Sequence, residues 1–197
     1  FTPFMWACIN GHKDVVKLLL DQADSNIDLN AKDNDEMTVF MFACHEGHFE
    51  VVKLLLEHSD QNIDLNAKDD DGSTAFISAC IEGHKGVVQL LLNHSDIDLN
   101  ITDDRGMTAF MYACFQGQKY VVKLLMDFSD RNIELNAKIN GYDYNAFTLA
   151  CLRGQKEVVQ LLLEHSNIID TNISENDLDL VDQETKDLIL DIKSIKK

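Results

Sequence analysis

The chain has little proline, few basic residues and no long apolar run. Its single proline excludes a collagen-like or proline-rich disordered chain. No stretch approaches the roughly 18 apolar residues that a transmembrane helix needs, so the sequence predicts no membrane span. Lys and Arg number only 17 against 34 Asp and Glu, which gives a formal net charge of -17.

This negative charge argues against two classes of partner. A polyanion gains nothing from the counterion release that drives binding to DNA or RNA, and an anionic membrane repels it. We therefore expect no nucleic acid and no membrane among the partners, whereas a basic protein surface would be attracted. The alternative is that the acidity only maintains solubility.

Motifs of catalysis and metal binding are missing as well. The sequence has no phosphate-binding Walker loop, no glycine pattern for a dinucleotide, and no serine or cysteine nucleophile motif. The run Asp69-Asp70-Asp71-Gly72 lacks the alternating ligands and the distal glutamate of a calcium loop, which favours a solvated turn. The sequence therefore predicts that the chain is not an enzyme and holds no cofactor and no metal.

What the sequence does contain is one pattern repeated five times. The first copy reads TPFMWACINGHKDVVKLLL and the second TVFMFACHEGHFEVVKLLL. Successive copies start 36, 36, 34 and 37 residues apart, at Thr2, Thr38, Thr74, Thr108 and Asn145. A period of this length indicates stacked supersecondary units, none of which buries its apolar face alone.

The second copy shows how one unit is built. Thr38 is a good N-cap, and the apolar residues of 40–44 recur at helical spacing, so a short helix is predicted to end at Gly47. The apolar residues of 51–56 predict a second helix. The polar stretch 63–72 is rich in turn formers and is interpreted as a projecting, hairpin-like finger.

These motifs resemble the ankyrin repeat: Thr2-Pro3-Phe4, Gly11-His12 and Val15 to Leu20 match its T-P-L, G-H and V-V-x-L-L-L segments. The match recurs in phase in all five copies and covers roughly residues 1–166. The resemblance implies an all-α solenoid of stacked helix-turn-helix units with projecting β-hairpin-like fingers, in which the first repeat lacks its finger. It also implies a concave side, formed by fingers and first helices, where partners dock.

The cysteines fall one per repeat. Packed helices lie about 8–10 Å apart, whereas a disulfide needs Cα atoms within about 7 Å, so equivalent cysteines are not expected to bridge. They are predicted to be small core residues, which fits the cytoplasm or another reducing intracellular compartment. The chain is also enriched in Asn, Asp, Ile and Lys, a composition typical of AT-rich genomes such as those of protists, their viruses or intracellular bacteria. A host cell into which the protein is delivered is therefore an alternative location. The cysteines are Cys8, Cys44, Cys80, Cys114 and Cys151.

One histidine or glutamine also recurs per repeat. Zinc ligands lie about 2 Å from the metal, which side chains repeated about 10 Å apart do not satisfy. The resemblance implies instead that this residue fastens its turn to the neighbouring repeat by hydrogen bonding. The set is His12, His48, His84, Gln118 and Gln155.

Each finger carries an asparagine after an acidic residue and leucine, at Asn30, Asn66, Asn100 and Asn136. It is interpreted as a turn residue whose amide bonds nearby backbone. The resemblance also permits hydroxylation of this asparagine.

After the repeats, residues 167–197 are interpreted as a C-terminal capping segment. Apolar positions at Val181, Thr185, Leu188, Ile189 and Ile192 predict an amphipathic helix. Because solenoids need polar caps, we expect this helix to cover the last repeat. The alternative is a docking helix for a partner.

A partner-binding surface is predicted from an internal comparison of the five copies. Positions that differ between copies have no duty in the repeat framework, and those on the first helices are spaced three apart, on one face. Aromatic side chains beside acidic fingers suit a partner with apolar anchors and Lys or Arg. The candidates are Trp6, Ile9, Asp35, Met37, Phe42, His45, Asp71, Ile81, Arg105, Met107, Tyr112, Phe115, Tyr142 and Tyr144.

The predicted function is therefore a non-enzymatic, monomeric module that binds a protein or peptide through its concave surface. One alternative is the targeting or substrate-recruiting domain of a larger enzyme or channel, of which this chain is a fragment. A second is a structural spacer. The alternative for the aromatic candidates is that their rings pack against the neighbouring repeat and bind no partner.

Overall fold

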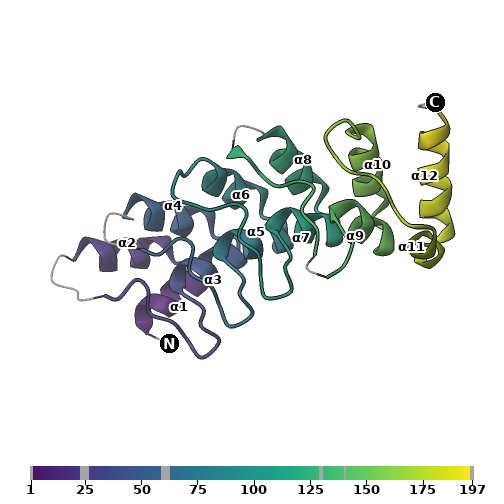
Figure 1. Cartoon of the computed structure of the whole chain (residues 1–197). Helices are drawn as coiled ribbons and strands as arrows, with labels where there is room; N and C mark the ends of the chain where they lie inside the picture. Colours follow the sequence, from purple (N-terminus) through teal and green to yellow (C-terminus); the bar gives the residue numbers. More distant parts are fainter. Residues whose placement is uncertain (1, 23–26, 59–62, 129–130, 140, 196–197) are drawn as a thin grey trace.

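The computed structural model describes residues 2–22, 27–58, 63–128, 131–139 and 141–195. Within them, ten helices form five successive pairs that stack into an elongated array (Figure 1). Each pair packs against the next, so the predicted all-α solenoid of helix-turn-helix units is confirmed. The first helices of the pairs are α1 (Pro3–Ile9), α3 (Val39–His45), α5 (Ala75–Glu82), α7 (Ala109–Phe115) and α9 (Ala146–Leu152). The second helices are α2 (Lys13–Asp21), α4 (Phe49–Glu57), α6 (Lys85–Leu92), α8 (Lys119–Asp127) and α10 (Lys156–Glu164).

Each first helix begins at a side chain that captures a free backbone N–H group. Thr38 Oγ1 accepts from the backbone N–H of Met41, and the other threonines that start copies act in the same way. The Met41 sulfur accepts the backbone N–H of Thr38 at 3.4 Å in return. In the fifth repeat Asn145 replaces threonine, and its Oδ1 accepts from the backbone N–H of Thr148. The copy starts seen in the sequence are therefore the N-caps of the first helices.

The turn between the two helices of a pair depends on glycine. Gly47 has a φ of 73°, in the left-handed region that side chains disfavour. A Cβ atom at Gly47 would also overlap the ring of His84 from the next repeat. Glycine thus serves both the turn and the close approach of successive repeats.

The core runs along the whole array as a layer between successive pairs. Phe40 and its equivalents Phe110 and Phe147 are at most 1% exposed. All five cysteines are free and buried, as predicted. Burial raises the pKa of the Cys8 thiol to about 12, and it raises the pKa of Cys44 further.

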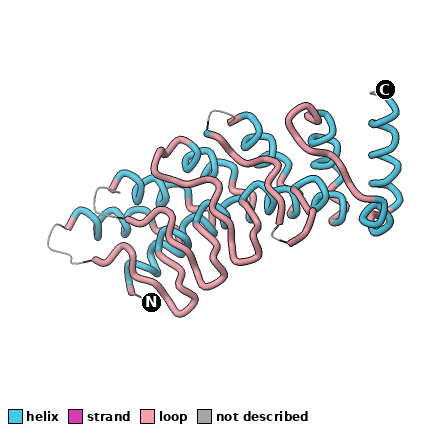
Figure 2. The backbone as a smooth tube through the Cα atoms, viewed as in Figure 1, coloured by secondary structure: helices cyan, strands magenta, loops and turns pink. Residues whose placement is uncertain are grey.

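The stretches between pairs project from the array as fingers (Figure 2). Isolated antiparallel bridges close two of them, at Lys32–Thr38 and Thr102–Thr108, as expected of a hairpin-like finger. Asp103 Oδ1 accepts from the backbone N–H groups of Arg105 at 3.1 Å and Met107 at 2.7 Å, which folds the tip. The equivalent aspartates of the two preceding fingers bond in the same way.

The finger asparagines join one repeat to the next, beyond the local turn expected from the sequence. Asn66 Oδ1 accepts from the backbone N–H of Asp98 at 2.8 Å, and its Nδ2 donates to the backbone carbonyl of Asp96 at 2.7 Å. Asn100 and Asn136 make the same two bonds to the segment 30 or more residues onward. A ladder of amides therefore clamps the fingers at fixed spacing.

Two helices follow the fifth repeat: α11 (Glu175–Leu180) contacts α9, and α12 (Gln183–Ile195) packs on α10. The sequence predicted only the second. Val181, Thr185 and Ile189 are buried, so the apolar side of the predicted amphipathic pattern is covered within the chain. The role of 167–197 as a cap, and its boundary with the repeats, stay predictions.

Candidate protein-binding surface

The candidate surface combines the first helices with the fingers, which is the concave side expected from the resemblance. One row of variable positions crosses the first helices at Trp6, Phe42, Ser78, Tyr112 and Leu149. Exposure along this row is graded: Trp6 is 55% exposed, Phe42 and Tyr112 are half-buried, and Ser78 and Leu149 are buried. Accessible ring surface is therefore concentrated in the first, second and fourth repeats.

A second row lies at the ends of the first helices, and its main chain has a framework role. The backbone carbonyl of Ile9 is bonded to His48 Nε2 at 2.7 Å, and that of His45 to His84 Nε2 at 2.8 Å. Gln118 and Gln155 donate from Nε2 to the carbonyls of Ile81 and Phe115 in the same geometry. The prediction that this residue fastens neighbouring repeats is confirmed. The side chains of the row remain half-buried.

Tyr112 carries an internal bond that the sequence did not reveal. Its hydroxyl donates to Asp103 Oδ2 at 2.6 Å, and Asp103 is only 5% exposed. Burial, together with the bond to Asp103, raises the pKa of Tyr112 to about 12. Asp103 was not a candidate, and its only signal in the sequence is the aspartate at the same place in each earlier finger. Part of the Tyr112 ring thus serves the repeat itself.

The finger candidates differ in accessibility. Asp35, Asp71 and Arg105 are exposed at the tips, and Met37 is half-buried. Met107 is 8% exposed because it belongs to the core cluster beneath its finger. The tips are joined by main-chain hydrogen bonds: the N–H of Asp70 donates to the Asp35 carbonyl, and that of Asp104 to the Asp71 carbonyl.

The aromatic candidates nearest the C-terminus engage in contacts within the chain. Tyr142 is 66% exposed and stacks on Tyr144, with ring centroids 5.7 Å apart. The Tyr144 hydroxyl donates to Asp177 Oδ1 at 3.0 Å. The guanidinium of Arg153 lies 4.5 Å from the centroid of the Phe115 ring. Of the candidate rings Phe115, Tyr142 and Tyr144, Tyr142 is the most accessible.

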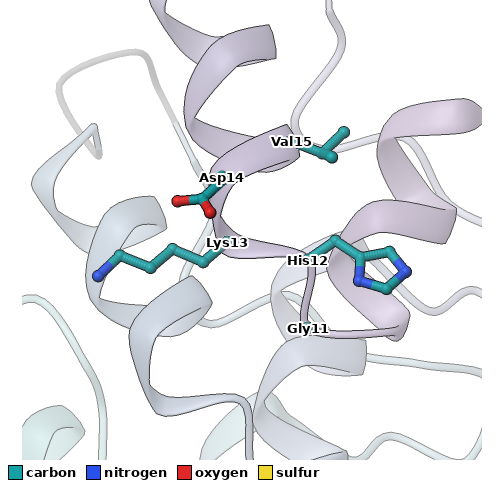
Figure 3. Close-up of a pocket in the computed structure, with 5 residues that line it drawn as sticks. All are labelled: Gly11, His12, Lys13, Asp14 and Val15. Carbon is teal, nitrogen blue, oxygen red and sulfur yellow. The ribbon is translucent and has the colours of Figure 1, made fainter.

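Outside this surface, the first repeat has an open side that the sequence candidates did not include. Val15 is 46% exposed, whereas the equivalent Val51 is 1% exposed because the preceding pair covers it. Leu18 is 60% exposed against 8% for Leu54. A shallow pocket lined by residues 11–15 lies next to Val15, at the first glycine-histidine turn. Figure 3 shows these residues, with the ring of His12 projecting from the ribbon.

Among the residues that the structure describes, no group of three or more His, Cys, Asp or Glu side chains is placed to hold a metal ion. Across the same ranges, every helix is too short or too polar to cross a bilayer.

Stacked helix pairs, projecting fingers and the hydrogen bonds between repeats define a helical repeat solenoid. The chain matches a family model described as ankyrin repeats (3 copies) at residues 1–69, 61–139 and 96–177. It therefore belongs to the ankyrin-repeat family, whose repeats are generally protein–protein interaction modules. No curated protein is similar enough to this chain to count as a match.

Proposed function

We propose that the chain is a non-enzymatic module that binds a protein or peptide through its concave surface. The observation that carries this proposal is a separation of roles along the first helices. Framework positions such as Phe40 and Cys44 are buried, whereas Trp6 and Phe42 differ between repeats and keep accessible surface. Large apolar side chains exposed beside a rigid framework are typical of binding surfaces.

The binding surface in this proposal contains most of the residues singled out from the sequence. Met107 acts only through the shape of its finger, because it is buried. The accessible members are Trp6, Ile9, Asp35, Met37, Phe42, His45, Asp71, Ile81, Arg105, Tyr112, Phe115, Tyr142 and Tyr144.

The partner in this proposal has both basic and apolar character. The fingertip carboxylates supply negative potential, and the rings of the first helices supply apolar contact area. We further propose that the chain acts as a monomer in the cytoplasm or another reducing intracellular compartment, or after delivery into a host cell. Its buried free thiols are compatible with such a location.

The test is quantitative capture of proteins from lysate of the source or host cell by the whole chain. A Trp6→Ala/Phe42→Ala variant is compared with a Leu180→Ala/Leu190→Ala control, which removes exposed apolar side chains from α11 and α12 instead. Circular dichroism first establishes that both variants keep their helices. A protein retained by the control and lost by the concave variant supports the proposal, and equal retention by all three contradicts it.

The second candidate function is recruitment of a target to a larger enzyme or channel. It is favoured by the exposed apolar side chains of Val15 and Leu18 on α2, which a further part of a larger protein would cover. Reading the source transcript upstream of residue 1 tests it: an open frame that encodes a catalytic or channel domain supports recruitment. A stop codon in that frame directly upstream contradicts it.

A further inference from the structure

Two neighbouring fingertips of the concave surface carry uncompensated negative charge. Within the described residues, the ion pairs of the fingers are Lys32–Glu36 and Lys138–Asp143, so Asp35 and Asp71 have no cationic partner. Both are exposed. The main-chain bond of 3.1 Å from Asp70 to Asp35 fixes the two tips side by side. The two carboxylates therefore lie on adjacent fingertips and add to the same negative potential.

The first-helix row lies within electrostatic reach of these fingers. Tyr112 is bonded to Asp103 of its own finger, and its pKa is also lowered by Arg105 of that finger and raised by Asp71 of the preceding finger. Because the repeats are equivalent, Ser78 occupies the same place relative to Asp69 and Asp35. The row and the fingertips thus form one surface, and their charges act on the same ligand.

Ser78 is the smallest side chain of the row and is 7% exposed, and the neighbouring repeats on either side carry rings at the equivalent position. Its helix α5 packs between α3, which carries Phe42, and α7, which carries Tyr112. The inferred position of a cationic side chain is therefore the accessible surface above Ser78, between the repeats that carry the two rings and on the side of the fingers. Aromatic faces attract Lys and Arg, and more strongly where the cation also meets a carboxylate.

The other end of the surface offers less charge for such a ligand. Asp143 is already paired with Lys138 at 3.0 Å, and Arg153 already occupies one face of Phe115. In the fourth finger, the exposed Arg105 adds a positive charge next to Asp104, whose N–H donates to the Asp71 carbonyl. The first three repeats therefore present the strongest combination of unpaired carboxylates and accessible rings.

We infer that the ligand of the concave surface is a peptide segment with a Lys or Arg close to an apolar side chain. The cation lies over Ser78 between Phe42 and Tyr112 and faces Asp35 and Asp71, and the apolar side chain rests on Trp6 of the first repeat. This inference rests on the proposed function, because it assigns a ligand class and a position to the same surface.

Selection of random dodecapeptides displayed on phage against the whole chain supplies the probe for the test. Binding of the enriched peptides is then measured by fluorescence anisotropy at about 0.05 and 0.3 M salt, where screening differs strongly. The principal variants are Asp35→Asn/Asp71→Asn, which removes the charge, and Ser78→Tyr, which places a bulky ring at the inferred position of the cation. The matched controls are Asp127→Asn at the end of α8 and Tyr120→Ala on the same helix, where the ring is 73% exposed outside the concave surface. A further variant, Tyr142→Ala in the fifth finger, probes the other end of the surface.

The expected result is enrichment of peptides that contain Lys or Arg beside an aromatic or aliphatic residue. The Asp35→Asn/Asp71→Asn variant should weaken their binding about tenfold at low salt and reduce the salt dependence. Ser78→Tyr should weaken it at both salt concentrations, and the controls should bind within about twofold of the unmodified chain. Because the asparagine variants keep the side-chain volume, they test the inference even if Ser78→Tyr proves unstable.

Other outcomes overturn the inference in distinguishable ways. Enrichment of acidic or neutral peptides, or no enrichment, overturns the assigned ligand class. Loss of binding with Tyr142→Ala but not with the Asp35 and Asp71 changes places the ligand at the other end, and the proposed function then stands. Peptides that bind all of these variants equally overturn the inference. The proposed function also fails if the same peptides bind the Trp6→Ala/Phe42→Ala variant equally, and it stands if that variant loses them.

Discussion

Replacing Gly83 by Ala should lower the free energy of unfolding by more than the cost of placing an alanine in the left-handed backbone region. Gly83 has a φ of 75°, and a Cβ atom there would overlap the side-chain amide of Gln118 from the next repeat. Gln118 would have to move, which breaks its 2.8 Å bond to the Ile81 carbonyl. Gly141 provides the matched control, because it has a φ of 81° and nothing within 4 Å of an added Cβ.

The surroundings of Gly83 and Gly141 set the expected loss in free energy of unfolding for each substitution. An alanine in the left-handed region costs about 1 kcal/mol, which is the whole effect expected for Gly141→Ala. At Gly83 the lost hydrogen bond adds about 1 kcal/mol and the displaced amide a further contribution, for about 2–3 kcal/mol in total. The free energy of unfolding is measured by urea titration, followed by circular dichroism.

A double-mutant cycle isolates the contact between repeats. In a Gln118→Ala background the obstructing amide is gone, so Gly83→Ala should cost no more than Gly141→Ala does. The coupling between Gly83 and Gln118 should therefore be about 1–2 kcal/mol. Equal destabilisation by Gly83→Ala and Gly141→Ala, or additive effects in the cycle, would refute the stacking role assigned to this glycine.

Three further predictions concern single side chains. Asn66→Ala removes two bonds to the next repeat and should lower the free energy of unfolding by about 2 kcal/mol, as measured by urea titration. Asn34→Ala, on an exposed fingertip, should change it by less than about 0.5 kcal/mol, and an equal loss would contradict the ladder. The pKa of Tyr112, about 12, is raised above the unfolded value of about 10, so its stabilising bond is complete below about pH 10 and lost as the pH rises through 12. Urea midpoints of the unmodified chain should therefore fall over that range more steeply than those of Tyr112→Phe, and parallel curves would contradict the assignment. Because burial raises the thiol pKa values, a thiol reagent at about pH 8 should leave Cys44 unmodified in the native chain and react with it after denaturation. Rapid reaction of the native chain would show that the core opens readily.

The elements that repeat in the sequence could be predicted from it. Thr38 as an N-cap, Gly47 as the turn and Cys44 as a core residue follow from local rules applied to one copy. Because the five copies align position by position, each of these predictions then applied to the equivalent residue in every repeat. Hydrogen bonds from His48 and Gln118 to the neighbouring repeat were also predicted, because hydrogen bonding is the property that both residue types share.

Contacts that depend on the register between repeats could not be derived in this way. Asn66 bonds residues 30 and 32 positions onward, and no local pattern specifies that distance. Tyr112 was predicted as a ligand anchor from its variability, yet its hydroxyl bonds to Asp103 within the repeat. A short helix such as α11 also escaped notice, because its polar sequence has no apolar periodicity and forms against α9.

The two rows on the first helices show how one position serves stacking and binding together. At Ile9, His45, Ile81 and Phe115, the atom used by the framework is the backbone carbonyl, which any residue supplies. The side chain at each position is therefore released from the requirements of stacking, and these four positions differ accordingly. In the row that contains Trp6, the choice of side chain is less constrained at Trp6, whose ring is exposed. It is more constrained at Tyr112, whose hydroxyl donates to Asp103 of its finger. Variation between copies thus marks positions free of side-chain duty, and accessibility in the structure decides which of them a ligand can reach.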